Sequence, residues 1–270
     1  MEYRKLGNLD VSVIGLGTLR TFDVADHDEI AVRRQIVDNC LDSDVNLIDT
    51  ASWYGHAEQV LGQITEDRRD RFYIATKVRT EGREAGEAQI ARSFELLQTE
   101  YIDLFQVHNM IDWQTHLPTL ERLKGEGKIG MLGVSAMAPD AYPTIMDLMR
   151  EGRVDTVQIP YNVMNRNVED ELLPLAEELG TGVLVMEPLQ KGRYILDLQQ
   201  PPDLTPLRDH GINTWAQALL AWVVSDRRVS SAIPTTSRPE RIRENAQAGE
   251  AAGLPQQFRD YIRSEAERCL

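Results

Sequence analysis

Short β-branched segments alternate with longer amphipathic segments along this chain, and that alternation is the feature that most constrains the fold. The short segments have the length and composition of buried strands, and they are Val11–Gly17, Val45–Asp49, Phe72–Lys77, Ile102–His108, Ile129–Val134, Thr156–Ile159, Gly182–Met186 and Val229–Ile233. The intervening segments have helical periodicity and lie near 28–43, 57–66, 84–99, 114–125, 139–150, 168–179, 214–225 and 239–250. Such repeated strand–helix pairs predict a parallel sheet covered by helices.

The spacing of the segments favours a closed barrel over an open sheet. Successive strands begin 34, 27, 30, 27, 27, 26 and 47 residues apart. Eight units of this size fit an α/β protein with a (β/α)8 TIM barrel, which takes about 250 residues as one domain. We therefore predict a single domain over residues 1–270, with a short N-terminal β-hairpin at 3–9. The long last interval predicts a functional or mobile loop from Glu187 to about Asn213.

Charge and composition exclude several classes of protein. The chain has 29 basic and 43 acidic residues, a net charge of −14, which disfavours nucleic acid and anionic lipid as partners. No apolar run approaches the roughly 20 residues of a membrane helix, and Met1–Lys5 leads into a polar turn rather than a signal peptide. Cys40 and Cys269 are expected to be free thiols. We expect a soluble cytoplasmic protein, a monomer with an oligomer left open.

Four side chains that can take part in acid–base chemistry follow the second, third and fourth predicted strands. They are Asp49, Tyr54, Lys77 and His108. Three of them have an ordinary structural alternative: Asp49 as a cap, Tyr54 as a half-buried packing residue, and His108 as a histidine whose hydrogen bonds are satisfied. Lys77 ends an apolar strand, where a buried ammonium needs a carboxylate, and Asp49 on the neighbouring strand would supply it. Because active sites of barrel enzymes lie at the carboxyl ends of the strands, the four residues together predict an active site there.

The sequence resembles the aldo-keto reductase family over nearly its whole length. The family has an Asp, a Tyr-Gly five residues later, then Lys and His at the next two strand ends, which Asp49, Tyr54-Gly55, Lys77 and His108 match. Further matches are Glu58, Leu61-Gly62, Gly133-Val134-Ser135, Gln158, Tyr161-Asn162, Ile233-Pro234 and Glu244-Asn245. The resemblance implies an NAD(P)H-dependent oxidoreductase that reduces an aldehyde or ketone to an alcohol by hydride transfer.

The catalytic roles that follow are chemically consistent. A phenol titrates near 10, and a nearby ammonium would lower the pKa of Tyr54, while the carboxylate of Asp49 keeps Lys77 charged. Tyr54 would then give its proton to the carbonyl oxygen as the general acid, and His108 would donate to or orient the same oxygen.

The resemblance also implies a cofactor site. The residues at the nicotinamide end, on the carboxamide and at the stacking position are Gly17, Thr18, Asp49, Ser135, Gln158 and Met186. Those over the pyrophosphate are Pro188, Leu189 and Gly192. Those around the adenosine are Thr235, Thr236, Ser237, Arg238, Arg241, Glu244 and Asn245. Ala136 and Thr235 replace the usual Asn and Lys, and that Lys contacts the 2′-phosphate in many members, so NAD(H) remains an alternative. Because Arg238 and Arg241 can still neutralise a phosphate, we expect NADP(H) to be preferred.

Other interpretations were weighed against this one. Gly15-Leu16-Gly17 suggests a dinucleotide-binding glycine motif, but Arg20 occupies the position of its third glycine. The five histidines and two cysteines have no metal-binding spacing, so no metal is expected. A cofactor-binding barrel could instead act as a regulatory or structural subunit beside a membrane channel, as some members of this family do.

The substrate-pocket residues are predicted from their positions beside the four catalytic candidates. Trp53 and Trp113, with Met110 and Ile111, suggest an apolar mouth suited to aromatic or alkyl carbonyls. Trp113 has an alternative role as the cap of the next helix. The partner expected from these residues is a small-molecule carbonyl compound.

Overall fold

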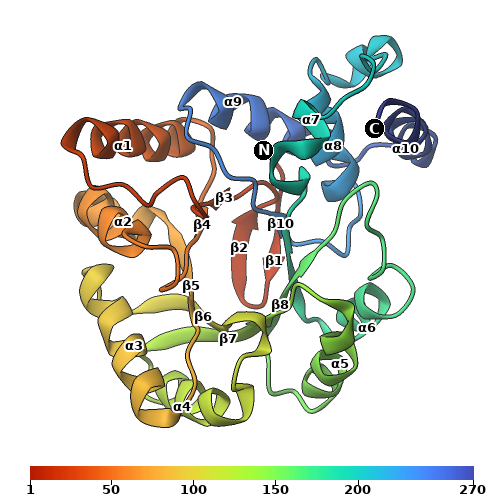
Figure 1. Ribbon diagram of the computed structural model, residues 1–270. Coiled ribbons are helices and arrows are strands. Elements are labelled where there is room, and N and C mark those ends of the chain that lie inside the picture. Colours follow the sequence, from red (N-terminus) through yellow and green to blue (C-terminus); the bar gives the residue numbers. More distant parts are fainter.

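A curled sheet of eight parallel strands forms the centre of the computed structural model, which describes residues 1–270 (Figure 1). The strands are β3 Leu16–Gly17, β4 Leu47–Asp49, β5 Tyr73–Val78, β6 Ile102–Val107, β7 Ile129–Ser135, β8 Thr156–Pro160, β9 Gly182–Met186 and β10 Ser231–Ala232. They pair in chain order. The first and last segments also meet, since the Gly15 N–H donates to the Ala232 carbonyl over 2.8 Å and the Ala232 N–H to the Val13 carbonyl over 2.9 Å. The predicted (β/α)8 barrel is confirmed.

A two-stranded antiparallel hairpin precedes the barrel, as predicted, but it extends further along the chain. It consists of β1 Tyr3–Leu6 and β2 Leu9–Ser12, which Figure 1 shows across the middle of the barrel. The prediction of a barrel strand beginning at Val11 is therefore wrong at its start. Val11 is fully buried and packs with Leu6 against residues that point into the barrel, such as Leu47 and Leu104. A strand that plugs a barrel carries the same apolar pattern as a strand within it.

Eight helices lie outside the strands, close to the predicted positions (Figure 1). They are α1 His27–Asp42, α2 Ala57–Thr65, α3 Arg83–Leu96, α4 Trp113–Gly125, α5 Tyr142–Arg150, α6 Leu172–Leu179, α8 Trp215–Val224 and α9 Glu240–Gln247. Helix α8 begins at a capping box, in which Thr214 accepts from the Gln217 N–H and Gln217 accepts from the Thr214 N–H. One apolar cluster from Val13 to Ala266 fills the space between strands and helices.

The long segment after β9 contains ordered structure. It includes α7 Arg193–Leu196 and a 3-10 helix at Thr205–His210. The C-terminal segment forms a further helix, α10 Gln256–Cys269, which the strand–helix alternation did not predict. The two segments contact each other, because the Gln199 N–H donates to the Cys269 carbonyl over 2.8 Å.

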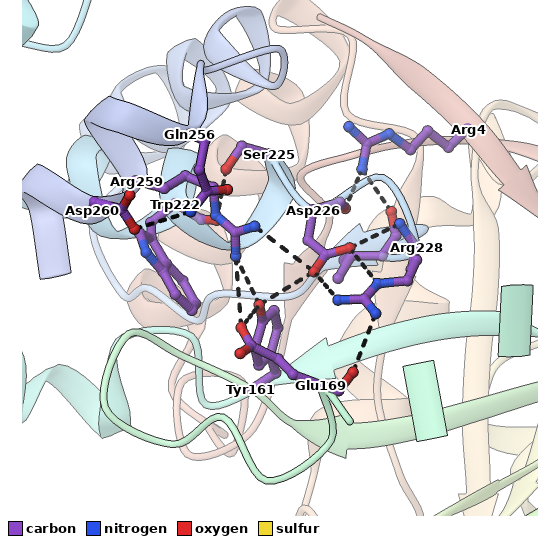
Figure 2. A network of polar contacts seen from close by, with 11 residues as sticks. Arg4, Tyr161, Glu169, Trp222, Ser225, Asp226, Arg228, Gln256, Arg259 and Asp260 are labelled. Atoms are coloured by element: carbon purple, nitrogen blue, oxygen red, sulfur yellow. Dashed lines mark hydrogen bonds and ion pairs between the residues drawn. The ribbon is translucent and has the colours of Figure 1, made fainter. Parts of the chain in front are cut away.

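Helix α10 is joined to the barrel by a group of polar residues that we call the α10 network: Tyr161, Glu169, Asp226, Arg228 and Arg259 (Figure 2). Arg259 on α10 donates to the Tyr161 hydroxyl over 2.9 Å, and that hydroxyl donates to Glu169 over 2.6 Å. Arg228 binds both carboxylate oxygens of Asp226, at 2.9 and 2.7 Å. The network therefore links α10 to the segments that follow β8 and α8.

Neither the helices nor the cysteines of this chain suggest a membrane-spanning or disulfide-bonded structure. No helix combines the length and apolar character needed to cross a bilayer. Cys40 and Cys269 are free and buried. Burial raises the pKa of the Cys40 thiol, which stays protonated.

Candidate active site

Lys77 on β5 and Asp49 at the end of β4 form a buried ion pair. Lys77 is completely buried, and its Nζ donates to the two carboxylate oxygens of Asp49 over 2.6 and 2.8 Å and to the Thr50 carbonyl over 2.7 Å. These acceptors satisfy all three N–H donors of the ammonium. Burial raises the pKa of Asp49 and lowers that of Lys77, and the charge of each residue opposes the shift of the other.

Tyr54 lies beside this pair, in the turn between β4 and α2. Its ring centroid is 5.4 Å from the Lys77 Nζ, and 9% of the residue is exposed. Burial raises the pKa of Tyr54, the charge of Asp49 raises it further, and Arg79 opposes the shift. The expected net lowering of this pKa is wrong for this structure, because burial and the charge of Asp49 dominate. Tyr54 is therefore a neutral phenol that can act as a proton donor.

His108 follows β6 and packs edge-on against Tyr54, with 5.8 Å between the ring centroids. Burial lowers the pKa of His108 to about 3, and the charges of Lys77 and Arg79 contribute to this shift. The imidazole is therefore neutral, with one donor and one acceptor nitrogen. Its buried Nδ1 has no hydrogen-bond partner within the protein.

Two glutamines continue the polar layer inside the barrel. Gln106 on β6 is the register partner of Lys77, and its Nε2 donates to the Oε1 of Gln158 over 2.9 Å. The Gln158 Nε2 lies 3.5 Å from the Asp49 carboxylate. Ser135, the register partner of Gln158, is buried and accepts a hydrogen bond from the Asn109 N–H over 2.9 Å. Side chains of β4, β5, β6 and β8 thus form one connected polar group, and Ser135 on β7 lies in register beside Gln158.

A cavity of about 420 Å³ opens above this layer, at the carboxyl ends of the strands. Many of the residues predicted for the site line it: Gly17, Thr18, Asp49, Trp53, Tyr54, His108, Gln158, Met186, Pro188, Leu189, Gly192 and Thr235. Lys77 and Ser135 are buried and do not line it. Trp113 is also outside the lining, because it begins α4 and packs against the apolar core.

Comparison with known proteins agrees with this geometry. The model of the Aldo/keto reductase family matches residues 13–267. The chain belongs to the aldo/keto reductase family. It is 30% identical to the methylglyoxal reductase YeaE of Escherichia coli, over 89% of this chain and 86% of the relative. It is 25% identical to an NADH-specific methylglyoxal reductase of the same organism, over 92% of this chain and 93% of the relative.

A solved structure gives the same result. The crystal structure of an aldo-keto reductase from Klebsiella pneumoniae in complex with NADPH matches with a TM-score of 0.80 and 29% identity. The match covers 92% of this chain and 89% of that chain. The resemblance inferred from the sequence is confirmed, and so is the assignment of this aldo/keto reductase to the oxidoreductases.

The residues predicted for the adenosine end of this aldo/keto reductase lie beyond the cavity. Of these, only Thr235 lines it; Thr236, Ser237, Arg238, Arg241, Glu244 and Asn245 do not. Arg241 and Glu244 form an ion pair with each other on α9. Arg238 is exposed, and its N–H donates to the Thr236 hydroxyl over 3.0 Å. These residues of the predicted adenosine end therefore contact one another and do not line the cavity.

Several cavity residues were not predicted, and Arg79 is the most prominent of them. It lies two residues after Lys77, and its guanidinium stacks on the Trp53 ring at 4.4 Å. The period of two along a strand places alternate side chains on one face, so this spacing was a usable signal. The same argument applies to Gln106, two residues before His108. The other lining residues that sequence analysis did not assign are Leu19, Arg20, Asn109, Met137, Glu187, Lys191, Ile233 and Pro234.

The loops around the cavity hold most of the strained backbone in the protein. Nine non-glycine residues have positive φ, and seven of them follow β3, β6 or β9: Arg20, Asn109, Met110, Asp112, Glu187, Gln190 and Lys191. Each such residue costs of order 1–3 kcal/mol, and this strain concentrates at ligand sites in proteins. Its distribution here points to the carboxyl ends of the strands as the functional face.

Proposed function

We propose that this aldo/keto reductase reduces a small aldehyde or ketone to the alcohol, with Tyr54 as the general acid. The observation that carries the proposal is the neutral Tyr54 phenol, which shares one cavity with neutral His108 and has the buried Lys77–Asp49 pair behind it. The relatives named methylglyoxal reductases support a small carbonyl substrate.

The residues lining the cavity fit a nicotinamide cofactor. Gly17 lies on the cavity wall and lets the end of β3 approach the segment after β10, because a Cβ at this position would lie 2.8 Å from the Ile233 carbonyl oxygen. Gln158 and Thr18 are polar groups on the wall, and the left-handed backbone at Gln190 and Lys191 shapes the loop beside them. We propose that these residues, with Ser135, Met186, Pro188, Leu189 and Gly192, hold the cofactor. When bound, the reduced cofactor supplies a hydride to the carbonyl carbon.

The protein supplies the proton and stabilises the charges. The Tyr54 hydroxyl donates to the carbonyl oxygen and transfers its proton as that oxygen gains negative charge, which leaves the alcohol. An alkoxide is a much stronger base than a phenolate, so the transfer is favourable even though burial raises the pKa of Tyr54. Lys77 stabilises the phenolate that remains, and Asp49 keeps Lys77 charged and oriented. His108, being neutral, donates an N–H to the same oxygen.

We propose NADP(H) as the preferred cofactor and NAD(H) as an alternative. One matching structure holds NADPH, whereas one relative is named NADH-specific. Arg238 and Arg241 are the cations available for a 2′-phosphate, with Thr235, Thr236, Ser237, Glu244 and Asn245 around them. If Arg241 serves this role, it exchanges its contact with Glu244 for the phosphate, and Arg241→Ala weakens NADPH binding about 3–10-fold. Arg243→Ala, on the same helix, is the matched control; equal binding by both variants would exclude Arg241.

The direct test of the activity is oxidation of NADPH with a panel of aldehydes. Tyr54→Phe is expected to reduce kcat about 10²–10⁴-fold, because it removes only the proton donor. NADPH binding, followed by its fluorescence, should persist in the variant. Turnover no greater than that of Tyr54→Phe would contradict the enzymatic role and leave a regulatory or structural cofactor-binding subunit.

We further propose that this protein works as a cytoplasmic monomer with residues 1–270 as a single domain. One apolar cluster runs from Val13 to Ala266, which supports a single cooperative unit. Two free cysteines are consistent with a reducing compartment. Light scattering during size-exclusion chromatography measures the mass directly, and a value near 30.6 kDa is expected.

A further inference from the structure

The acidic residues of the cavity wall are already compensated. Asp49 binds Lys77 at 2.6 Å, and Glu187 binds Lys191 at 2.7 Å. These two are the only carboxylates among the lining residues. Any further cation on the wall therefore has no acidic partner within the cavity.

Two further cations do lie there. Arg20 and Arg79 line the cavity, and neither forms an ion pair within 4.0 Å. The chain has 43 acidic residues and a net charge of −14, so a shortage of carboxylates does not explain why Arg20 and Arg79 lack an acidic partner. A guanidinium that is half-buried and unpaired leaves its hydrogen-bonding and charge requirements for a ligand to meet.

Arg79 is the one of these two that adjoins the reacting groups. It is half-buried and follows β5, two residues after Lys77, and its charge lowers the pKa of both Tyr54 and His108. Arg20 is exposed and follows Gly17 and Thr18, on the side proposed for the nicotinamide.

The stack of Arg79 on Trp53 orients the guanidinium. The Arg79 Cζ lies 4.4 Å from the ring centroid, so the indole covers one face of the planar group. Stacking leaves the N–H donors along the edge free, and that edge matches the two oxygens of an acid group. Trp53 is 62% exposed, so the pair stands at the entrance. Its indole acts as a platform for a cation, so the mouth that the sequence predicts to be apolar also carries a positive charge.

We propose that Arg79 binds an acid group of the substrate, so that the preferred substrates are small aldehydes or ketones carrying a carboxylate or a phosphate. The inference rests on the proposed carbonyl reduction in this cavity. The acid group binds at the edge of the guanidinium, while the carbonyl oxygen meets Tyr54 and His108. Met137 and Leu19 supply apolar surface for the carbon chain between the two ends.

The test compares each acid with a neutral counterpart. For wild type we expect kcat/KM for 4-oxobutanoate to exceed that for its methyl ester about 10–100-fold, as for a charged hydrogen-bonded contact. Glyceraldehyde 3-phosphate against glyceraldehyde forms the second pair and distinguishes phosphate from carboxylate. In Arg79→Gln, the ratio of kcat/KM for the preferred acid to kcat/KM for its neutral counterpart should fall close to one, mainly because the KM for the acid rises. Arg20→Gln is the matched control and should keep the ratio.

A binding measurement separates recognition from turnover. Calorimetric titration of 4-hydroxybutanoate or glycerol 3-phosphate into protein saturated with NADP⁺ should show binding to wild type and at least 10-fold weaker binding to Arg79→Gln. The inference would be overturned if wild type reduced each acid and its neutral counterpart with equal kcat/KM, or if Arg79→Gln and Arg20→Gln lowered the preference for the acid equally. Carbonyl reduction would still stand in either case. Failure to reduce any carbonyl, neutral or acidic, would overturn the proposed function and this inference with it.

Discussion

Two buried polar groups in this barrel contain the same types of residue and differ in what they leave unsatisfied. The proposed catalytic cluster consists of Asp49, Tyr54, Lys77 and His108; the α10 network also combines an aspartate, a tyrosine and cations (Figure 2). The hydroxyl of Tyr161 donates to Glu169 and accepts from Arg259. The hydroxyl of Tyr54 makes no hydrogen bond within the protein and faces the cavity.

The aspartates of the two groups, Asp226 and Asp49, differ in how far neighbouring cations offset the effect of burial on their pKa. Burial would raise the pKa of Asp226, but the hydrogen bonds and charges of Arg228, with Arg259, outweigh it and lower this pKa. Burial raises the pKa of Asp49, and the single cation Lys77 does not fully offset it. The α10 network thus has its tyrosine and its aspartate satisfied by internal contacts, although the buried Nε of Arg259 has no partner, and it holds a helix. The other leaves the hydroxyl of Tyr54 and the Nδ1 of His108 without internal partners, so both remain free for a ligand.

The largest expected effect is on the Lys77–Asp49 pair. Lys77→Met should lower the free energy of unfolding by about 3–5 kcal/mol, because it leaves a buried carboxylate without its partner. Lys77→Met/Asp49→Leu should regain most of that stability and still lack activity. Urea unfolding and NADPH-dependent turnover measure the two properties. A double variant as unstable as the single one would mean that the pair contributes more than mutual compensation.

A variant of the α10 network should lose stability but keep its activity. Asp226→Asn should lower the free energy of unfolding by about 2–3 kcal/mol, because two guanidinium groups lose their carboxylate. The kcat of the variant should stay within about threefold of wild type, since Asp226 does not line the cavity. A larger fall in kcat would show that the two groups are coupled.

His108 provides a pH-dependent test. In the unfolded protein the His108 imidazole binds a proton below about pH 6.5, whereas in the folded protein it stays neutral down to about pH 3. Between these pH values the unfolded state binds more protons, so lowering the pH favours unfolding. Lowering the pH from 7 to 5 should therefore cost wild type about 1–2 kcal/mol more than His108→Asn. Urea unfolding at several pH values gives the two slopes. Parallel slopes would mean that folded His108 titrates normally.

The two tyrosines give the smallest expected change in stability and the clearest contrast in activity. Tyr161→Phe should lower the free energy of unfolding by about 1 kcal/mol through lost hydrogen bonds, with activity retained. Tyr54→Phe should leave stability within about 0.5 kcal/mol and abolish most activity. If both variants lost stability equally, the Tyr54 hydroxyl would have an internal partner.

Local patterns in the sequence were enough to predict the barrel and the strand ends at which Asp49, Tyr54, Lys77 and His108 come together. Strand and helix periodicity depends on neighbouring residues, and a parallel barrel brings its strand ends together whatever the details. The start of the first strand was misplaced because Val11 carries a buried-strand pattern from the hairpin that plugs the barrel. Helix α10 was missed because it lies outside the strand–helix repeat.

By itself, the sequence determined the barrel and the residue types gathered at the carboxyl ends of its strands, where we propose that the chemistry takes place. Only the tertiary structure decided their charge states and partners, because these depend on burial and on distances of a few ångströms. It left Tyr54 as a neutral phenol beside the predicted Asp49–Lys77 pair. It joined Arg241 to Glu244, and it placed Arg79 over Trp53 at the entrance of a cavity whose carboxylates were already engaged.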